Sequence, residues 1–184
     1  MLKHVVHLMP FYDVPGRAPF SGAENHLFTL MRGQQAAGWQ VDLVMIVGKD
    51  GPRLHDRAEE LRREGFGVTL VPHTITGLGF LPRLARPLIV PKLVRLLRHA
   101  HDKVLHIHPV TGSGGLIALA TWLAGCRKVV VSYHDRAPKL AHFPYKHGLR
   151  LIDRLARRTI AVSDGVRDHL VHNVGLSPDR TRVV

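Results

Sequence analysis

The sequence predicts an α/β fold built on one Rossmann-like, doubly wound and mainly parallel sheet of about seven strands, with helices on both faces. Three observations lead to this fold class. Short β-branched runs alternate with helical runs along the whole chain, and no internal repeat interrupts them. Continuous apolar strands such as 129–131 suit a parallel sheet that is covered on both faces. The loop after the first strand ends in a small-residue turn that opens a helix, as in open α/β sheets.

The expected elements follow from apolar runs and apolar periodicity, taken in chain order. The helix after the first loop carries Leu27, Leu30 and Met31 on one face, and Gly38 stops it before a second apolar strand begins. Strands are expected at 4–9, 41–47, 68–72, 104–108, 129–133, 159–163 and 181–184, and helices near 22–37, 53–64, 84–100, 112–124, 145–157 and 164–173.

The bulk composition describes a globular chain. With 184 residues, 45% of them hydrophobic, a single domain over 1–184 is expected. One cysteine, Cys126, excludes a disulfide framework and suits a reducing compartment. The N-terminus shows no signal-peptide pattern, and the longest apolar run, 114–126, is too short to span a bilayer. We therefore expect a cytoplasmic protein.

The chain is strongly basic. Its net charge of +12, from 26 Lys and Arg against 14 Asp and Glu, indicates an acidic partner. The arginines are spread over helices, and aromatic residues make up only 6% of the chain, whereas stacking on single-stranded nucleic acid uses interleaved aromatics. A lipid or a phosphate is therefore favoured over nucleic acid.

Residues 77–98 depart from the regular pattern, because they mix arginines with aliphatic residues and three prolines. Apolar positions in the second half of this segment lie opposite Lys92, Arg95 and Arg98. Two interpretations stay open. One is a basic amphipathic helix on the anionic inner face of a membrane, which gives the chain a peripheral membrane contact. The other is a helix that covers the sheet and has a cationic outer face.

The turn Ser21-Gly22-Ala23 opens the first helix, with Glu24 following it. A glycine at a helix N-terminus lets backbone N–H groups approach an anion, and the helix dipole favours negative charge there. Because the turn follows the first strand, it lies where ligands sit in open α/β sheets. It is therefore a candidate site for a phosphate or an anionic sugar.

His106 and His108 end the fourth strand and, two residues apart, point to the same face. An HxH pair can begin a zinc site, but the next residues offer no further ligand, so no metal is expected. His108, at the carboxyl edge, is interpreted as a ligand-facing hydrogen bonder, and His106 as partly buried. The glycines of the run 111–115 either offer backbone N–H donors or serve close packing.

His134 and Asp135 follow the fifth strand, where a histidine can bond a phosphate, a sugar hydroxyl or a leaving oxygen. Asp135 can orient it or accept from a hydroxyl; the alternative is an ordinary loop histidine. Ser163 ends the sixth strand, and its simplest role is to cap the helix that carries Arg167. No serine lies in a GxSxG turn and no GxxxxGK[ST] run is present, which excludes a hydrolase with that turn and a P-loop nucleotidase.

Taken in order, these motifs resemble the N-terminal domain of a GT-B glycosyltransferase of the large retaining family 4. The run 21–26 matches the family turn GG-A-E-x-H, 37–41 its G-H-E-V strand entry, 105–108 its vHxH strand, 132–135 its S-x-H-D end, and Ser163 with Arg167 its i-a-v-S-x-x-x-r run. The resemblance covers essentially the whole chain. Ser21 departs from it, because many members have glycine there.

The resemblance implies transfer of a sugar, of the hexosyl type, from a nucleotide-sugar to a glycan or lipid-linked acceptor, with retention at the anomeric carbon and no metal or other cofactor. It implies that the first-strand turn lies close to the donor diphosphate and that His134 lines the sugar and acceptor cleft. The expected catalytic residues are His134 and Asp135, and the expected donor-diphosphate and substrate-binding residues are Ser21, Gly22, Ala23, Glu24, His108, Ser163 and Arg167.

In that family the strand that matches 181–184 leads into a second Rossmann-like domain, which carries the nucleotide contacts. We therefore expect a donor-nucleotide domain outside this chain, in a longer protein or a partner chain, and we expect the isolated chain to bind donor weakly and transfer no sugar. One alternative is a non-catalytic module that binds an anionic glycan, lipid or nucleotide. Another, half of a dinucleotide-binding dehydrogenase, is disfavoured because the acidic residue after the second strand, Asp50, comes late.

Overall fold

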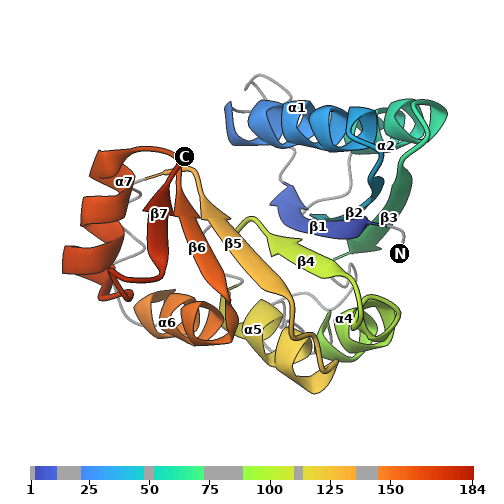
Figure 1. Ribbon diagram of the computed structural model, residues 1–184. Helices are drawn as coiled ribbons and strands as arrows, with labels where there is room; N and C mark the ends of the chain where they lie inside the picture. The colour runs from blue at the N-terminus through green and yellow to red at the C-terminus, as the bar shows by residue number, and fades with distance from the viewer. Residues whose placement is uncertain (1–2, 12–21, 48–51, 73–88, 110–113, 136–144) are drawn as a thin grey trace. The chain divides into compact units, whose positions relative to one another are not determined.

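The computed structural model describes residues 3–11, 22–47, 52–72, 89–109, 114–135 and 145–184 (Figure 1). The chain divides into two compact units, Met1–Arg86 and Pro87–Val184, and each is considered by itself below.

The described residues of the first unit form a three-stranded parallel sheet with two crossover helices. Its elements are β1 (His4–Phe11), α1 (Gly22–Ala36), β2 (Gln40–Val47), α2 (Pro52–Arg63) and β3 (Gly67–Pro72). The strand order is β3-β2-β1, with Leu8 level with Val44 and Met45 level with Leu70. Both helices lie on the same face of these strands (Figure 1), as right-handed crossovers running in one direction require.

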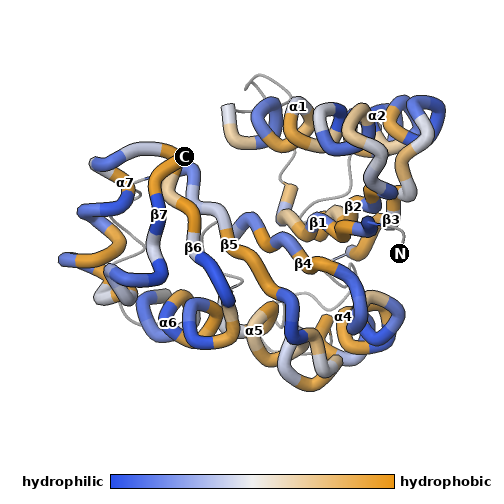
Figure 2. Tube along the Cα trace, viewed as in Figure 1, coloured by the Kyte–Doolittle hydropathy of each residue, from blue (hydrophilic) through white to orange (hydrophobic). Residues whose placement is uncertain are grey.

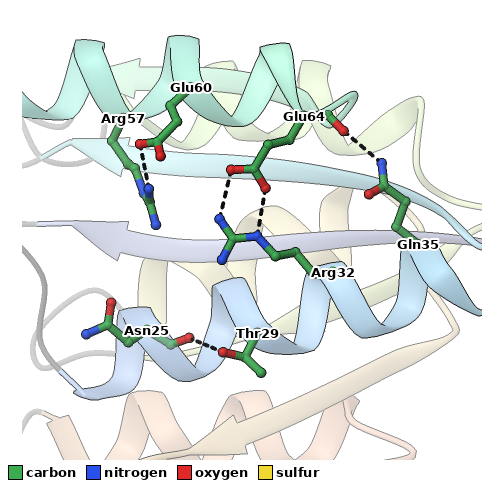
Figure 3. Close-up of polar contacts among 7 residues, drawn as sticks. All are labelled: Asn25, Thr29, Arg32, Gln35, Arg57, Glu60 and Glu64. Carbon is green, nitrogen blue, oxygen red and sulfur yellow. Dashed lines mark hydrogen bonds and ion pairs between the residues drawn. The ribbon is translucent and has the colours of Figure 1, made fainter.

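Polar contacts tie α1 to the end of α2 (Figure 3). The Nε and Nη2 of Arg32 donate to the two carboxylate oxygens of Glu64 at 2.7 and 2.8 Å, a bidentate pair. Gln35 Nε2 donates to the backbone oxygen of Glu64 at 3.1 Å. Within α2, Arg57 pairs with Glu60 one turn later. Arg32 and Arg57 of these two helices therefore have acidic partners on the same surface.

The second unit is a four-stranded parallel sheet in the order β4-β5-β6-β7. Its elements are α4 (Ile89–Arg98), β4 (Val104–Ile107), α5 (Gly114–Leu123), β5 (Val129–Tyr133), α6 (Tyr145–Leu155), β6 (Arg158–Ala161), α7 (Asp164–Asp168), η3 (His169–Val174) and β7 (Thr181–Val183). Helix α5 contacts both α4 and α6, and the three form one layer on a face of these strands (Figure 1).

The expected α/β class is confirmed, because within the described residues seven strands alternate with helices and each strand pairs in parallel with a neighbour. The first and last residue of each strand lie within two residues of the predicted bounds. The predicted helix 164–173 differs, since it is a short α-helix followed by a π-helical turn. Gly175 ends that turn with a φ of 82°, in the left-handed region that favours glycine.

The basic segment 77–98 is described only from residue 89 onward. In α4 the apolar residues Ile89, Val90, Leu93 and Leu97 are buried, while Lys92, Arg95 and Arg98 are exposed. The interpretation as a sheet-covering helix with a cationic outer face is therefore confirmed for this part. The interpretation of α4 as a helix that lays its own apolar face on a membrane is wrong, because that face is used in the core. None of the described helices is long and apolar enough to cross a membrane.

A glycine contact sets how closely α5 and α6 approach. A Cβ built on Gly148 of α6 would lie 2.6 Å from the backbone nitrogen of Gly115 and 3.1 Å from its Cα. These partners are backbone atoms, which have no rotamer to change. A Cβ built on Gly114 would lie 3.3 Å from Leu149 Cδ2 and 3.5 Å from Ile152 Cδ1 of the same helix, α6. Close packing therefore accounts for Gly148 and for Gly114, whereas a Cβ on Gly115 would make only an ordinary contact, 3.7 Å from the Cα of Gly148. Residues 111–113 of that run lie outside the described ranges.

We expect Gly148→Ala to lower the free energy of unfolding by about 1–3 kcal/mol, because the added methyl forces the two helices apart. Gly33→Ala is the matched control, since Gly33 lies exposed within α1 and its Cβ would meet no described atom within 4 Å. That control should gain roughly 0.5–1 kcal/mol from helix propensity. Urea unfolding measures both, and a Gly148→Ala variant as stable as the control would contradict the contact.

A buried carboxylate links α6 to the strands beyond it. Asp153 is almost fully buried and accepts hydrogen bonds from Thr159 Oγ1 at 2.7 Å and Arg180 Nη2 at 3.0 Å. Nearby, burial and the negative charge of Asp153 raise the pKa of Tyr133 far above its ordinary value, so this phenol stays neutral. The hydroxyl of Tyr133 is buried with no hydrogen-bond partner among the described residues.

In the first unit, His7 is a fully buried histidine on β1. Its Nε2–H donates to Gln34 Oε1 at 2.7 Å. Burial lowers the pKa of His7 from 6.5 to about 4, and the hydrogen bond opposes this shift only in part. His7 is therefore neutral in the folded protein at physiological pH.

The titration of His7 predicts an acid-linked loss of stability. Because its folded pKa lies below the unfolded value, the unfolded chain binds more protons between pH 6.5 and 4, and stability falls as the pH falls through this window. We expect His7→Gln to remove about 3 kcal/mol of that pH dependence. Urea unfolding at stepped pH measures it, with His99→Gln as an exposed control. Parallel curves for wild type and His7→Gln would be inconsistent with this assignment.

Candidate functional site

The carboxyl ends of β4 and β5 bring polar side chains together in the second unit. The two strands pair in parallel with His106 level with Val130 and Ile107 level with Val131. Because side chains alternate along a strand, His106 and His108 share one face with Ser132 and His134. The four residues, His106, His108, Ser132 and His134, are called the histidine row below.

Direct contacts join the histidine row in pairs. His106 Nε2 lies 2.7 Å from Ser132 Oγ, and His108 Nδ1 lies 3.0 Å from His134 Nε2. The rings of His106 and His108 pack with centroids 4.2 Å apart, and those of His108 and His134 stack at 5.3 Å. His108 is fully buried, His106 and Ser132 are nearly so, and His134 is half-buried. His134 is thus the member of the row that reaches the surface.

This geometry separates the roles of two predicted site residues. His134 can meet a ligand, and Asp135 beside it is exposed. His108 is fully buried, and its ring contacts that of His134; its use as a ligand contact remains a prediction. In the hydrogen bond between them one nitrogen donates and the other accepts, so the tautomers of the two rings are coupled. A ring fixed in this way presents one defined nitrogen as donor or acceptor to an oxygen of a ligand.

Each histidine of the HxH pair has a described partner, and the expectation that no metal binds there remains a prediction. One nitrogen of His106 is engaged by Ser132 and one nitrogen of His108 by His134. Ser132 was missed as a site residue. Its signal is the alternation along β5, which puts it on the same face as His134, but the partner is known only once the register of β4 against β5 is known.

Ser163 and Arg167 have structural partners near the end of β6. Ser163 Oγ accepts from the backbone nitrogen of Val166 at 3.3 Å, so it caps α7 as predicted. Arg167 Nε donates to the backbone oxygen of Thr181 at 3.4 Å, which links α7 to β7. Both side chains stay partly exposed. Their use as ligand contacts remains a prediction.

The predicted anion turn is described from Gly22 onward, and Ser21 lies outside the described ranges. Gly22 is the first residue of α1 and is exposed, and a Cβ built on it would meet no described atom within 4 Å. Packing against the described residues therefore gives no reason for a glycine here. Ala23 and Glu24 follow in the first turn and are half-buried. Since this turn and the histidine row belong to different units, their common use of one ligand remains a prediction.

The sequence matches the family model described as Glycosyltransferase Family 4 over residues 20–184. The chain belongs to this family. A comparison with curated proteins gives no match.

Solved structures share the fold of this Family 4 chain. A glycosyltransferase from Rickettsia africae ESF-5 has a TM-score of 0.64 at 14% identity, and the match covers 100% of this chain and 42% of the Rickettsia chain. UDP-GlcNAc 2-epimerase from Methanocaldococcus jannaschii has a TM-score of 0.62 at 10% identity, covering 98% of this chain and 45% of its own. MurG from Acinetobacter baumannii has a TM-score of 0.57 at 13% identity, and the match covers 97% of this chain and 44% of the MurG chain. The chain thus spans less than half the length of each of these structures.

The buried position of His108 predicts what its replacement does to this Family 4 chain. His108→Phe keeps a ring against His106 but removes the nitrogen that bonds His134. We expect a loss of about 1 kcal/mol in unfolding free energy and a changed tautomer balance at His134, read from long-range ¹H–¹⁵N spectra of the histidine rings. His99→Phe, at an exposed position, is the control. An unaltered His134 ring spectrum in His108→Phe would refute the positioning role.

Proposed function

We propose that this chain is the acceptor-side domain of a retaining glycosyltransferase that moves a sugar, of the hexosyl type, from a nucleotide-sugar to a glycan or lipid-linked acceptor. Membership of Family 4 supports the sugar transfer. The observation that supports the site is the half-buried ring of His134 at the carboxyl end of β5. Its Nε2 lies 3.0 Å from Nδ1 of the fully buried His108. A fixed imidazole there suits a hydrogen bond to a sugar hydroxyl or a departing phosphate oxygen.

In this proposal His134 contacts the sugar, and Asp135 accepts from a hydroxyl of the substrate. The backbone N–H groups at the start of α1, from Gly22 to Glu24 and with Ser21 before them, hold the donor diphosphate, because a helix N-terminus favours an anion. His108 acts through His134 as a positioning residue. No metal is assigned, and we propose that the protein works in the cytoplasm.

The nucleotide itself needs further contacts. UDP-GlcNAc 2-epimerase, by its name, acts on a nucleotide-sugar, and this chain covers 45% of that structure. We infer that a second domain or a partner chain supplies the nucleotide contacts. The 184-residue chain alone should then bind donor with a dissociation constant on the order of 1 mM and transfer nothing.

Sugar transfer by the full natural protein tests the proposal. With UDP-N-acetylglucosamine and other nucleotide-sugars as donors, His134→Ala should lower the rate of nucleoside diphosphate release by about 10²- to 10⁴-fold. Gly22→Asp should also abolish it, because a carboxylate repels the diphosphate while the position has room for a side chain. His99→Ala is the control at an exposed site.

Three outcomes decide between the candidates. Wild-type rates in both variants would remove the site assignment. Transfer by the purified 184-residue chain would overturn the proposed need for a second domain. Tight nucleotide-sugar binding without release of product in any form of the protein would favour the non-catalytic binding module.

A further inference from the structure

The layer formed by α4, α5 and α6 leaves apolar side chains uncovered. Leu119, Trp122 and Leu123 of α5 are 40, 64 and 46% exposed, and Leu151 on the adjacent α6 is 43% exposed. Residues 119, 122 and 123 are three and four positions apart and therefore lie on one face of α5. Single exposed aliphatic residues are ordinary, but a tryptophan among three exposed leucines on neighbouring helices marks an interaction surface.

Cations flank this apolar stripe. Lys92, Arg95 and Arg98 are exposed along α4, and Arg154 is exposed on α6 one turn after Leu151. Helix α5 contacts both of these helices and has no charged residue of its own. Figure 2 shows the apolar α5 with hydrophilic positions on α4 and α6. The surface made by Lys92, Arg95, Arg98, Leu119, Trp122, Leu123, Leu151 and Arg154 is called the α4–α6 surface.

The same three helices have no exposed acidic side chain. Neither α4 nor α5 contains an Asp or a Glu, and the single acidic residue of α6, Asp153, is buried and bonded to Arg180. Within the described part of the chain, the four cations of the α4–α6 surface form no ion pair. The helices of the first unit contrast with this. Arg32 pairs with Glu64 and Arg57 with Glu60 there (Figure 3), and Arg62 pairs with Glu59.

From this arrangement we infer that the α4–α6 surface docks on an anionic membrane. The apolar side chains of α5 enter the boundary between headgroups and acyl chains, where tryptophan is favoured, while the flanking cations stay at headgroup level. Juxtamembrane cations are attracted to anionic lipid, whereas a second copy of this surface would bring like charges together. The charge therefore selects a membrane over self-association.

Docking through the α4–α6 surface differs from insertion of α4 alone. The apolar face of α4 is buried in the core, so α4 supplies charge and α5 supplies the apolar contact. Docking through this surface is independent of the histidine row and of sugar transfer, because none of the residues of the α4–α6 surface belongs to the proposed site.

Tryptophan fluorescence gives a direct test with the 184-residue chain. The chain has two tryptophans, and Trp39→Phe leaves Trp122 as the single reporter while keeping an aromatic ring near Lys3. Vesicles of equal parts phosphatidylglycerol and phosphatidylcholine should shift the Trp122 emission to the blue, and brominated lipid should quench it. Phosphatidylcholine alone should do neither. The binding should weaken as salt rises.

Charge reversal locates the contact. In the Trp39→Phe background, Arg95→Glu/Arg98→Glu should weaken binding to the anionic vesicles about tenfold or more. Arg53→Glu/Arg63→Glu makes the same change of net charge on exposed positions of α2 and should weaken it far less. Trp122→Gln in the wild-type background, followed by vesicle co-sedimentation, should weaken binding without altering its dependence on salt. Circular dichroism checks that each variant is folded.

Each contrary result overturns the inference. An unshifted Trp122 emission with anionic vesicles at low salt excludes the contact. Equal losses in the two double variants would assign binding to the net charge of +12 and not to this surface. A blue shift that depends on protein concentration without vesicles, together with dimers in sedimentation, would show that a second copy covers the surface. A nucleotide-sugar assay with a water-soluble acceptor is independent of all these outcomes.

Discussion

The parallel pairing of β4 with β5 is the constraint on which the candidate site depends. With His106 level with Val130, alternation puts two histidines of one strand and the Ser132–His134 pair of the next on a single face. A slip of one residue would turn β5 over and place Tyr133 where Ser132 now stands. The register is fixed from the other face, where Val129, Val131 and Tyr133 are fully buried. Core packing thus determines the geometry of the polar row.

The two faces of the sheet in the second unit have different roles. On the face with the histidine row, His134 is the half-buried member of that row, and hydrogen bonding and stacking with His108 hold its ring. The helices that cover the other face are locked by the glycine contact of Gly148 with Gly115 and by the buried Asp153. A rigid layer of this kind suits an outer surface that presents Trp122 and the flanking cations in a fixed pattern.

Much of the fold and the position of His134 could be predicted from the sequence, because both depend on local patterns. β-branched and apolar runs located the strands, and the position of His134 after a buried strand put it at the carboxyl end of β5, where the structure has it half-buried. What could not be predicted depends on contacts between elements. The bond from His106 to Ser132 requires the register, and the role of Gly148 requires the approach of α6 to α5. An uncharged helix such as α5 is ordinarily expected in the core, so the exposure of Trp122 became visible only in the folded structure.

A double-mutant cycle on sugar transfer by the full natural protein tests the central claim most directly. The claim is that His108 serves the site only through His134. Single variants His108→Phe and His134→Ala are compared with the double variant by kcat/KM. If the claim holds, the double variant is no slower than His134→Ala alone, because the ring that His108 positions is already gone. Losses that multiply would contradict it, since they would mean that the two histidines act on the reaction independently.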